Sequence, residues 1–187
     1  MDDITLTVNR GEVVAIVGES GSGKSVTSLS LLQLLPEKKV HYPTGRILFS
    51  ADGQSQSNLL TLSEPQLRQV RGSSIAMIFQ EPMTSLNPVF TCGDQVMESL
   101  ILHKGCSNAV ARQETMALFG KVGLPDPENM LRRYPHEISG GQKQRVMIAM
   151  AISCNPVLLI ADEPTTALDV TVQKNILALL GSIQQEN

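Results

Sequence analysis

The chain has 187 residues, a formal net charge of −3, 42% hydrophobic residues and 18% charged residues. These values are typical of one globular domain, or of a domain with an inserted subdomain, and they exclude a disordered chain. Basic residues never run for more than two positions, so the sequence indicates neither a nucleic-acid surface nor a patch for anionic membranes.

Cysteine content and the N-terminus bear on the cellular compartment. The three cysteines are widely spaced and form no C-x-x-C pair, which favours reduced packing thiols over a disulfide framework or a metal cage. No apolar run approaches the roughly 20 residues of a membrane-spanning helix. Met1-Asp2-Asp3 lacks the basic start of a signal peptide. We therefore expect a cytosolic chain, with any membrane role supplied by a partner.

The first part of the chain mixes predicted strands and helices. Alternating or continuous apolar residues predict strands at residues 4–8, 13–17, 45–49 and 74–79, the second of them buried. A leucine-rich helix is predicted from Lys24 to Leu35, stopped by Pro36, and Asp52-Gly53 is a turn signal. Ser63 and Gln66 form a capping box for a short helix that Gly72 ends.

The pattern of the middle of the chain predicts helices. We predict helices at residues 94–104, 107–122 and 142–154, then a strand at 157–161 and a last helix at 170–185. Strands, a helical insert and a strand again predict an α/β fold. The expected organisation is a core made of residues 1–90 and 156–187, interrupted by a helical subdomain of residues 91–155.

A glycine-rich stretch follows the predicted buried strand and opens the first helix. It fits the pattern G-x-x-x-x-G-K-[ST], whose glycines let backbone N–H groups converge on phosphate oxygens while the helix adds its positive N-terminal end. Lys24 is expected to reach the β- and γ-phosphates of ATP, and Ser25 to bind Mg²⁺. The alternative is a glycine-rich turn that binds no ligand. The predicted nucleotide-binding residues are Gly18, Glu19, Ser20, Gly21, Ser22, Gly23, Lys24 and Ser25.

Two acidic residues end the apolar strand at residues 157–161. A carboxylate at the end of a buried strand is costly unless a positive group meets it. Asp162 holding Mg²⁺ through water would satisfy that need, and Glu163 would then act as general base toward the attacking water. Taken alone, such a pattern more often marks a strand that simply enters a loop. It becomes a strong signal only in combination with the phosphate loop.

The stretch "ISGGQKQR" places small residues before the predicted helix at 142–154. Ser139, Gly140, Gly141 and Gln142 would offer a second helix N-terminus to an anion. One nucleotide does not need two such sites far apart in the chain, whereas two chains facing each other would use both. In isolation, the stretch is better explained as a serine-capped helix after a Gly-Gly turn.

These motifs together resemble those of ABC-transporter ATPase subunits. Gly18–Ser25, Gln80, Ser139–Gln142, Leu158–Pro164 and Ala167–Asp169 occur in the order of that family's Walker A, Q-loop, signature, Walker B and D-loop motifs. The resemblance implies a P-loop NTPase (RecA-like) core with an inserted ABC-type helical subdomain. It also implies roles in nucleotide contact for Asp169 and in Mg²⁺ and water contact for Gln80. Ile138 departs mildly from the leucine usual at that position.

The stretch "AMIFQEPMTSLNPVFT", residues 76–91, resembles the branch that imports dipeptides, oligopeptides, nickel and glutathione. The resemblance implies a second ATPase subunit, identical or paralogous, docked head to tail. It also implies membrane-spanning permease subunits and, indirectly, a periplasmic or extracellular binding protein, with no nucleic acid. The expected location is the inner face of the cell membrane. His136, beside the signature, is interpreted as structural.

Two family elements fall outside this sequence: an adenine-stacking aromatic residue upstream and a γ-phosphate-contacting histidine downstream. The family also places a strand between the Walker A and Walker B strands. Without it, residues 13–17 and 157–161 lack a shared neighbour, and each buried unpaired backbone group costs about 1–3 kcal/mol. We expect the 187 residues to be part of a longer subunit and to hydrolyse ATP poorly by themselves.

The function expected from the sequence is ATP hydrolysis that powers a peptide importer, with Lys24, Gln80 and Glu163 as the principal catalytic residues. Import of nickel or glutathione is the nearest alternative. A soluble ABC ATPase of DNA repair or translation is another, although the short span from Gln80 to Ser139 holds no coiled-coil or zinc insert. A catalytically silent nucleotide-binding module and a kinase complete the alternatives.

Overall fold

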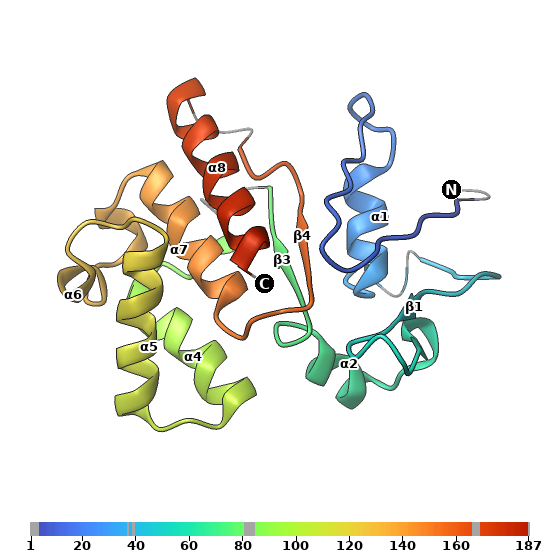
Figure 1. The fold of residues 1–187 in the computed structure, drawn as a ribbon, viewed down its shortest axis with the longest axis horizontal. Helices are drawn as coiled ribbons and strands as arrows, with labels where there is room; N and C mark the ends of the chain where they lie inside the picture. Colours follow the sequence, from blue (N-terminus) through green and yellow to red (C-terminus); the bar gives the residue numbers. More distant parts are fainter. Residues whose placement is uncertain (1–3, 37, 39, 81–84, 166–168, 187) are drawn as a thin grey trace. The chain divides into compact units, whose positions relative to one another are not determined.

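The computed structural model describes residues 4–36, 38, 40–80, 85–165 and 169–186. The chain divides into two compact units, residues 1–71 and residues 72–187. Figure 1 shows the elements of both units in their sequence colours.

The first unit carries the glycine-rich loop and a small hairpin. Helix α1, Lys24–Leu31, follows the loop, and strands β1 (Leu48–Phe49) and β2 (Ser57–Asn58) pair antiparallel. A 3-10 turn, Leu59–Thr61, and helix α2, Glu64–Val70, complete the unit. The predicted turn at residues 52–53 joins the two short strands, with Gly53 at a φ of 77°. The predicted helix start is confirmed, because the Ser63 N–H donates to Gln66 Oε1 at 2.9 Å.

The strands predicted at residues 4–8 and 13–17 are not found. These residues belong to neither described sheet, and all of them are exposed, Val17 to 91%. A strand is stable only when a neighbour satisfies its backbone groups, and within the described part of the chain no strand pairs with residues 13–17. The sequence pattern identified an apolar segment correctly, but its burial requires a neighbour that this structure does not provide.

The second unit is built on a parallel pair of strands. β3, Ile75–Ile78, pairs with β4, Leu158–Ala161, in the register Ile75 to Leu158 through Ile78 to Ala161. Both strands were predicted, and three of the four β3 residues are buried. Parallel pairing brings the carboxyl ends of the two strands to the same edge. The residues that follow β3 and β4 therefore lie side by side.

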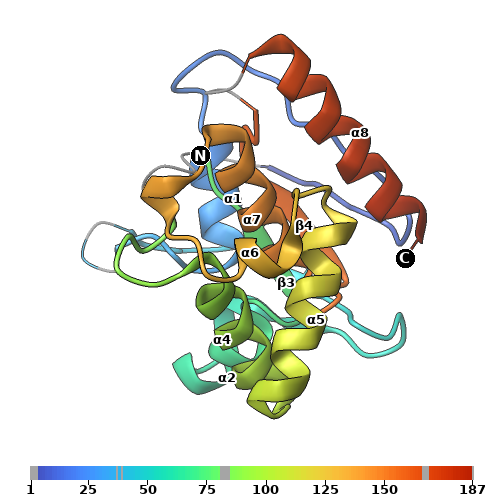
Figure 2. The same ribbon diagram turned by 90° about the vertical axis from the view of Figure 1, so that its left-hand side faces the viewer.

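Helices fill the long connection between these two strands. They are α4 (Cys92–Lys104), α5 (Asn108–Lys121), the short α6 (Pro127–Met130), a 3-10 turn (Pro135–Glu137) and α7 (Gly140–Ile152), and α8 (Val170–Glu186) follows β4. Thr91 and Ser107 cap α4 and α5 with their hydroxyls. α4, α5 and α7 lie together in two views at right angles (Figures 1 and 2). The helix predictions are confirmed to within a few residues, and α6 was not predicted.

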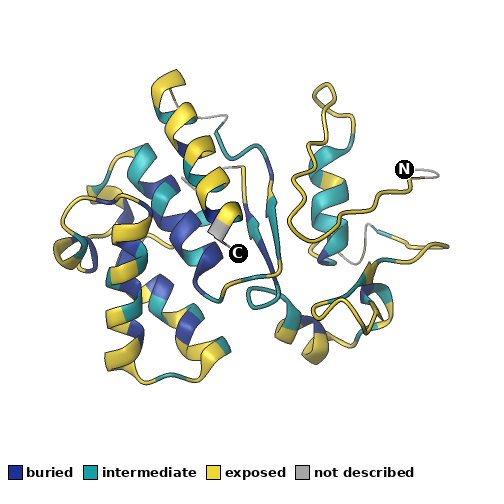
Figure 3. Cartoon of the chain, viewed as in Figure 1, coloured by how far each residue is buried: buried dark blue, intermediate teal, exposed yellow. Residues whose placement is uncertain are grey.

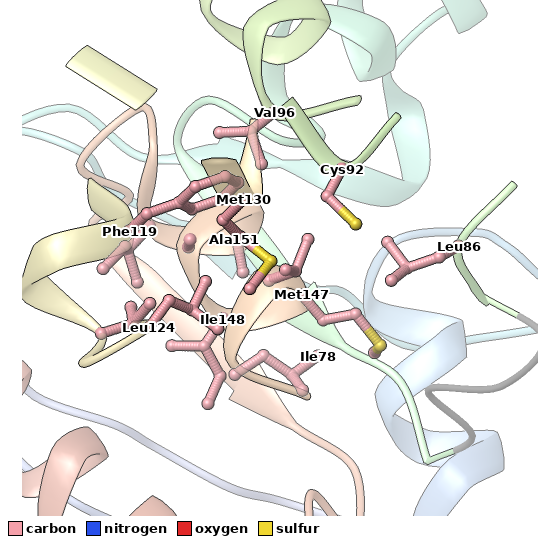
Figure 4. Close-up of a cluster of buried hydrophobic side chains, with 14 of the residues drawn as sticks. Ile78, Leu86, Cys92, Val96, Phe119, Leu124, Met130, Met147, Ile148 and Ala151 are labelled. Atoms are coloured by element: carbon pink, nitrogen blue, oxygen red, sulfur yellow. The ribbon is translucent and has the colours of Figure 1, made fainter. Parts of the chain in front are cut away.

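The hydrophobic core of the second unit lies around α7. Eight of its thirteen residues are buried, and Figure 3 shows most of α7 in dark blue, whereas α5 and α8 carry many exposed residues. The side chains of Phe119, Val146 and Ile148 are fully buried, and Ile78 and Met147 join the same cluster (Figure 4). The core thus holds the start of α7 and the ends of the strands in one packed body.

Among the described residues, no helix has the length and apolar content needed to cross a bilayer.

Candidate functional site

The glycine-rich loop adopts a conformation that requires its glycines. Gly21 and Gly23 have φ angles of 82° and 99°, in the left-handed region where a Cβ atom is unfavourable. At Gly18 a Cβ atom would lie 2.6 Å from Ser22 Oγ. Side chains at these positions would open the loop, so the pattern of the motif reflects backbone geometry.

Lys24 lies at the first position of α1 and its side chain turns back into the loop. Its Nζ donates to the carbonyl oxygens of Gly18 at 2.9 Å and Glu19 at 3.1 Å. Gly23 precedes the helix without a side-chain cap, and the first N–H groups of a helix have no acceptor within the helix. An ammonium group and the positive end of α1 therefore lie at one place, a combination that favours phosphate.

The residues that follow β3 and β4 meet, as parallel pairing requires. Gln80 Nε2 donates to Glu163 Oε2 at 2.9 Å, across 83 positions of sequence. The Asp162 N–H donates to Ile78 O at 3.0 Å, and Asp162 is only 8% exposed. Three residues that the sequence singled out separately therefore form one cluster.

Glu163 has a φ angle of 45°, in the left-handed region that side chains rarely occupy. Such backbone strain costs on the order of 1–3 kcal/mol and persists only where the surroundings impose it. It turns the chain sharply after β4, and the carboxylate of Glu163 then reaches the amide of Gln80. The strain coincides with the residue that was predicted to be the general base.

The start of α7 is held by a reciprocal cap. The Ser139 N–H donates to Gln142 Oε1 at 3.0 Å, and the Gln142 N–H donates to Ser139 Oγ at 3.3 Å. A Cβ atom at Gly141 would lie 3.2 Å from Val172 Cγ1, on the first turn of α8. Gly141 therefore has a packing role, because a larger residue there would press against α8.

Asp169 lies at the N-terminus of α8, where its Oδ1 accepts the Val172 N–H at 2.9 Å. Val172 thus contacts both residues: its N–H bonds Asp169, and its side chain packs beside Gly141. Val172 was not identified from the sequence, because it belongs to none of the polar or glycine motifs. The predicted residues Ala167 and Leu168 lie outside the described part of the chain.

In the second unit the structure joins Gln80, Asp162 and Glu163, and separately joins the start of α7 to Asp169. Residues 18–25 form the other candidate site, in the first unit.

The residues present suit Mg²⁺ and a phosphate ligand. Mg²⁺ commonly takes one or two carboxylates and completes its shell with water and phosphate oxygens. Ser25 offers a hard oxygen donor in the first unit, and Gln80 and Asp162 offer such donors in the second. The described residues include no cluster of three or more His, Cys, Asp or Glu that would hold a metal unaided. The Lys24 ammonium at the uncapped start of α1 suits a phosphate group, and the oxygen donors suit Mg²⁺.

Comparison with known proteins places the chain in a family. A family model described as ABC transporter matches residues 1–166. The chain is 57% identical over 187 residues to the peptidoglycan transport ATP-binding protein YejF of Agrobacterium fabrum, covering all of this chain and 33% of that protein. It is 53% identical over 184 residues to the glutathione import ATP-binding protein GsiA of Salmonella typhimurium, covering 98% of this chain and 30% of that protein.

A third relative is a Brucella ovis protein provisionally named as a peptide import ATP-binding protein. It is 51% identical over 187 residues, which cover all of this chain and 55% of that protein. The chain therefore spans between about a third and about half of the length of these relatives.

Solved structures agree with the family match. A dimeric, post-hydrolysis structure of the ATP-binding cassette MJ0796 with ADP and phosphate is 29% identical, with a TM-score of 0.79 over 97% of this chain and 73% of that chain. The predicted fold class, a P-loop NTPase core with an ABC-type helical insertion, is confirmed by this likeness. The chain belongs to the ABC transporter family, and its fold is that of the family's ATP-binding cassette.

Proposed function

We propose that this chain is the ATP-binding and ATP-hydrolysing part of an ABC importer of the peptide type. The observation that carries the proposal is the phosphate loop of residues 18–25, folded around the Lys24 ammonium in a chain of the ABC transporter family. The names of the three relatives add support, because each describes an ATP-binding protein of transport or import.

In this proposal the loop binds the phosphates of ATP. Backbone N–H groups of residues 18–25 and the N-terminal end of α1 surround the phosphate oxygens, and Lys24 neutralises the β- and γ-phosphates. Ser25, Gln80 and Asp162 would hold Mg²⁺, which supplies charge neutralisation when it is bound.

The hydrolytic step rests on the cluster that follows β3 and β4. Glu163 accepts a proton from the attacking water at a carboxylate oxygen, and Gln80 orients that water through its amide. The hydrogen bond between these side chains supports the assignment, because it places the carboxylate and the amide within reach of one small molecule.

The proposed partner is a second ATPase subunit docked head to tail, for which the dimeric form of the MJ0796 cassette is a precedent. Ser139, Gly140, Gly141, Gln142 and Asp169 would contact the nucleotide held by that partner. Permease subunits would receive the movement, and a periplasmic or extracellular binding protein would take part indirectly. The proposed location is the cytoplasmic face of the cell membrane, in agreement with the absence of a spanning helix among the described residues.

The cargo is proposed to be a peptide. Glutathione, itself a small peptide, is the second candidate, favoured by the 53% identity to a glutathione import protein, whereas nickel has no support from the relatives described. The name of the Agrobacterium relative extends the range to peptidoglycan-derived material.

The test is hydrolysis of Mg-ATP by the natural protein and by its Glu163→Gln variant. We expect turnover that falls at least about 100-fold in the variant, the usual contribution of a general base, with nucleotide binding retained. The variant should also accumulate as an ATP-dependent dimer on a sizing column. Turnover at the parental rate in Glu163→Gln would refute the role of Glu163, and no ATP binding by the parent would refute the proposed function.

A further inference from the structure

Arg71 lies at the end of α2, and its guanidinium group contacts the far end of α1. Its Nε donates to Leu32 O at 2.8 Å and its Nη2 donates to Gln33 O at 3.1 Å. The third arm, Nη1, forms an ion pair with Glu64 Oε1 at 2.9 Å. The side chain is 21% exposed, and its two bonds to carbonyl oxygens are partly buried, whereas the ion pair with Glu64 is exposed. One planar fork therefore binds two carbonyl groups and one carboxylate.

Those two carbonyl groups belong to the turn that ends the phosphate-loop helix α1, directly after its last residue, Leu31. The turn ends with Gln33 at a φ angle of 50°, and the Leu34 N–H donates back to Leu29 O at 3.0 Å. The last carbonyls of a helix have no donors within the helix and form its negative end. A guanidinium group supplies both the donors and the opposite charge at this end.

A second contact holds the same turn from the other direction. Gln33 Nε2 donates to Leu59 O, at 2.6 Å, on the 3-10 turn that precedes α2. In the Arg71 contact this turn supplies the acceptors, and in the Gln33 contact it supplies the donor. Together they fix the rotation and the axial position of α1 against the α2 segment. Because α1 has only eight residues, its other end moves with them.

We propose that Arg71 is a positioning residue for the phosphate loop, acting through the carbonyl groups of the turn that ends α1. Gly23, Lys24 and Ser25 lie at the opposite end of that short helix, so a helix anchored at Leu32 and Gln33 presents them in one orientation. The inference rests on the proposed nucleotide binding and adds to it a residue far from the loop in sequence. Sites that must hold a ligand depend in this way on supporting contacts.

The chain supplies two matched controls. Arg68 is on the same helix and bonds the same carboxylate oxygen, at 3.3 Å, but it is 77% exposed and no bond from it to α1 is among those described. Leu67, 4% exposed on α2, tests loss of packing without loss of the guanidinium contacts. Arg71→Lys retains the charge while losing the planar fork that binds two carbonyls at once.

The experiment measures the affinity of the natural protein for Mg-ATP and for Mg-pyrophosphate, at a temperature where each variant is folded by circular dichroism. The variants are Arg71→Met, Arg71→Lys, Arg68→Met and Leu67→Ala. We expect Arg71→Met to weaken both ligands by the same factor, about tenfold, the low end of what loss of supporting contacts costs at other sites. Arg71→Lys should fall between parent and Arg71→Met, and both controls should bind as the parent does.

Equal loss for both ligands locates the effect at the part of the site that binds phosphate, which the two ligands share. The circular dichroism check and the Leu67→Ala control separate this effect from general destabilisation, which would also weaken both ligands equally. If the parent binds and Arg71→Met binds equally well, or no worse than Leu67→Ala, the positioning role is wrong while the proposed function stands. If the parent binds neither ligand, both proposals fail. If Arg71→Met does not fold, Arg71→Lys decides the question by the same comparison.

Discussion

The amide of Gln80 donates to the carboxylate of Glu163, Nε2 to Oε2, at 2.9 Å. The two residues follow strands that are 80 positions apart, and parallel pairing of β3 with β4 is what brings them together. Oε2 of the carboxylate is therefore engaged by the Gln80 amide. In the proposed mechanism an incoming water must share this amide or replace it.

Loss of the Gln80 amide should separate nucleotide binding from hydrolysis. Gln80→Leu keeps the bulk of the side chain and removes the hydrogen-bond donor. We expect Mg-ATP affinity near that of the parent and turnover about ten- to a hundredfold slower, because a polar group that positions the water is lost. Steady-state hydrolysis and equilibrium binding measure the two quantities. Unchanged turnover would remove Gln80 from the catalytic cluster.

Gly93 and Gly120 make a matched pair for the packing of the helical segment. A Cβ atom at Gly93 would lie 2.5 Å from Leu131 O, whereas one at Gly120 would meet no atom within 4 Å. Gly93→Ala should lower the free energy of unfolding by about 1–3 kcal/mol through overpacking. Gly120→Ala should raise it, by at most about 1 kcal/mol, because alanine is the better helix former. Urea denaturation measures both, and a stabilised Gly93→Ala variant would contradict the packing described.

Thr115 is an unusual buried hydroxyl. It is fully buried on α5, and its Oγ1 has no hydrogen-bond partner within the described residues. Thr115→Val removes the polar atom at nearly constant shape, so the free energy of unfolding should stay equal or rise by up to about 1–3 kcal/mol. Thr91→Val is the control, because Thr91 Oγ1 accepts the Asp94 N–H and its loss should cost about 0.5–2 kcal/mol. A destabilised Thr115→Val would indicate a hydrogen bond at Thr115.

The buried thiol of Cys92 should make the free energy of unfolding depend on pH in the alkaline range. Burial, followed by the charge of Glu137, raises the pKa of Cys92 from 9.0 to about 11. Between these two pKa values the unfolded chain loses the thiol proton while the folded chain keeps it, so stability should fall as pH rises through this range. Chemical denaturation from pH 8 to pH 11 measures the slope, which Cys92→Ala should flatten. An unchanged slope in Cys92→Ala would show that another group causes it.

The outcome at particular residues shows which features were predictable from sequence. Local signals were reliable: the capping box at Ser63 and the glycine pattern at residues 18–25 both report constraints carried by neighbouring residues. Gln80, Asp162 and Glu163 were identified one at a time from local motifs. Their meeting was not predicted, because it depends on the pairing of β3 with β4, which the apolar pattern of each strand does not specify.

Relationships that depend on distant partners were not predictable in the same way. The strand predicted at residues 13–17 failed because its burial depends on a neighbour, which an apolar pattern does not specify. Val172 and Arg71 were missed because their roles arise from contacts with Gly141 and with the end of α1. Neither residue type nor local spacing carries that information.

The most direct test of the central claim is thermal unfolding of the protein with and without Mg-ATP, alongside Lys24→Ala. Lys104→Ala is the control, since Lys104 forms an exposed ion pair with Glu114 on the helical segment. Selective binding to the folded state raises its stability by about 2.7 kcal/mol at a hundredfold excess over Kd. The account predicts an upward shift of the unfolding midpoint in the parent and in Lys104→Ala that is lost in Lys24→Ala. A shift that persists in Lys24→Ala, or no shift in the parent, would contradict it.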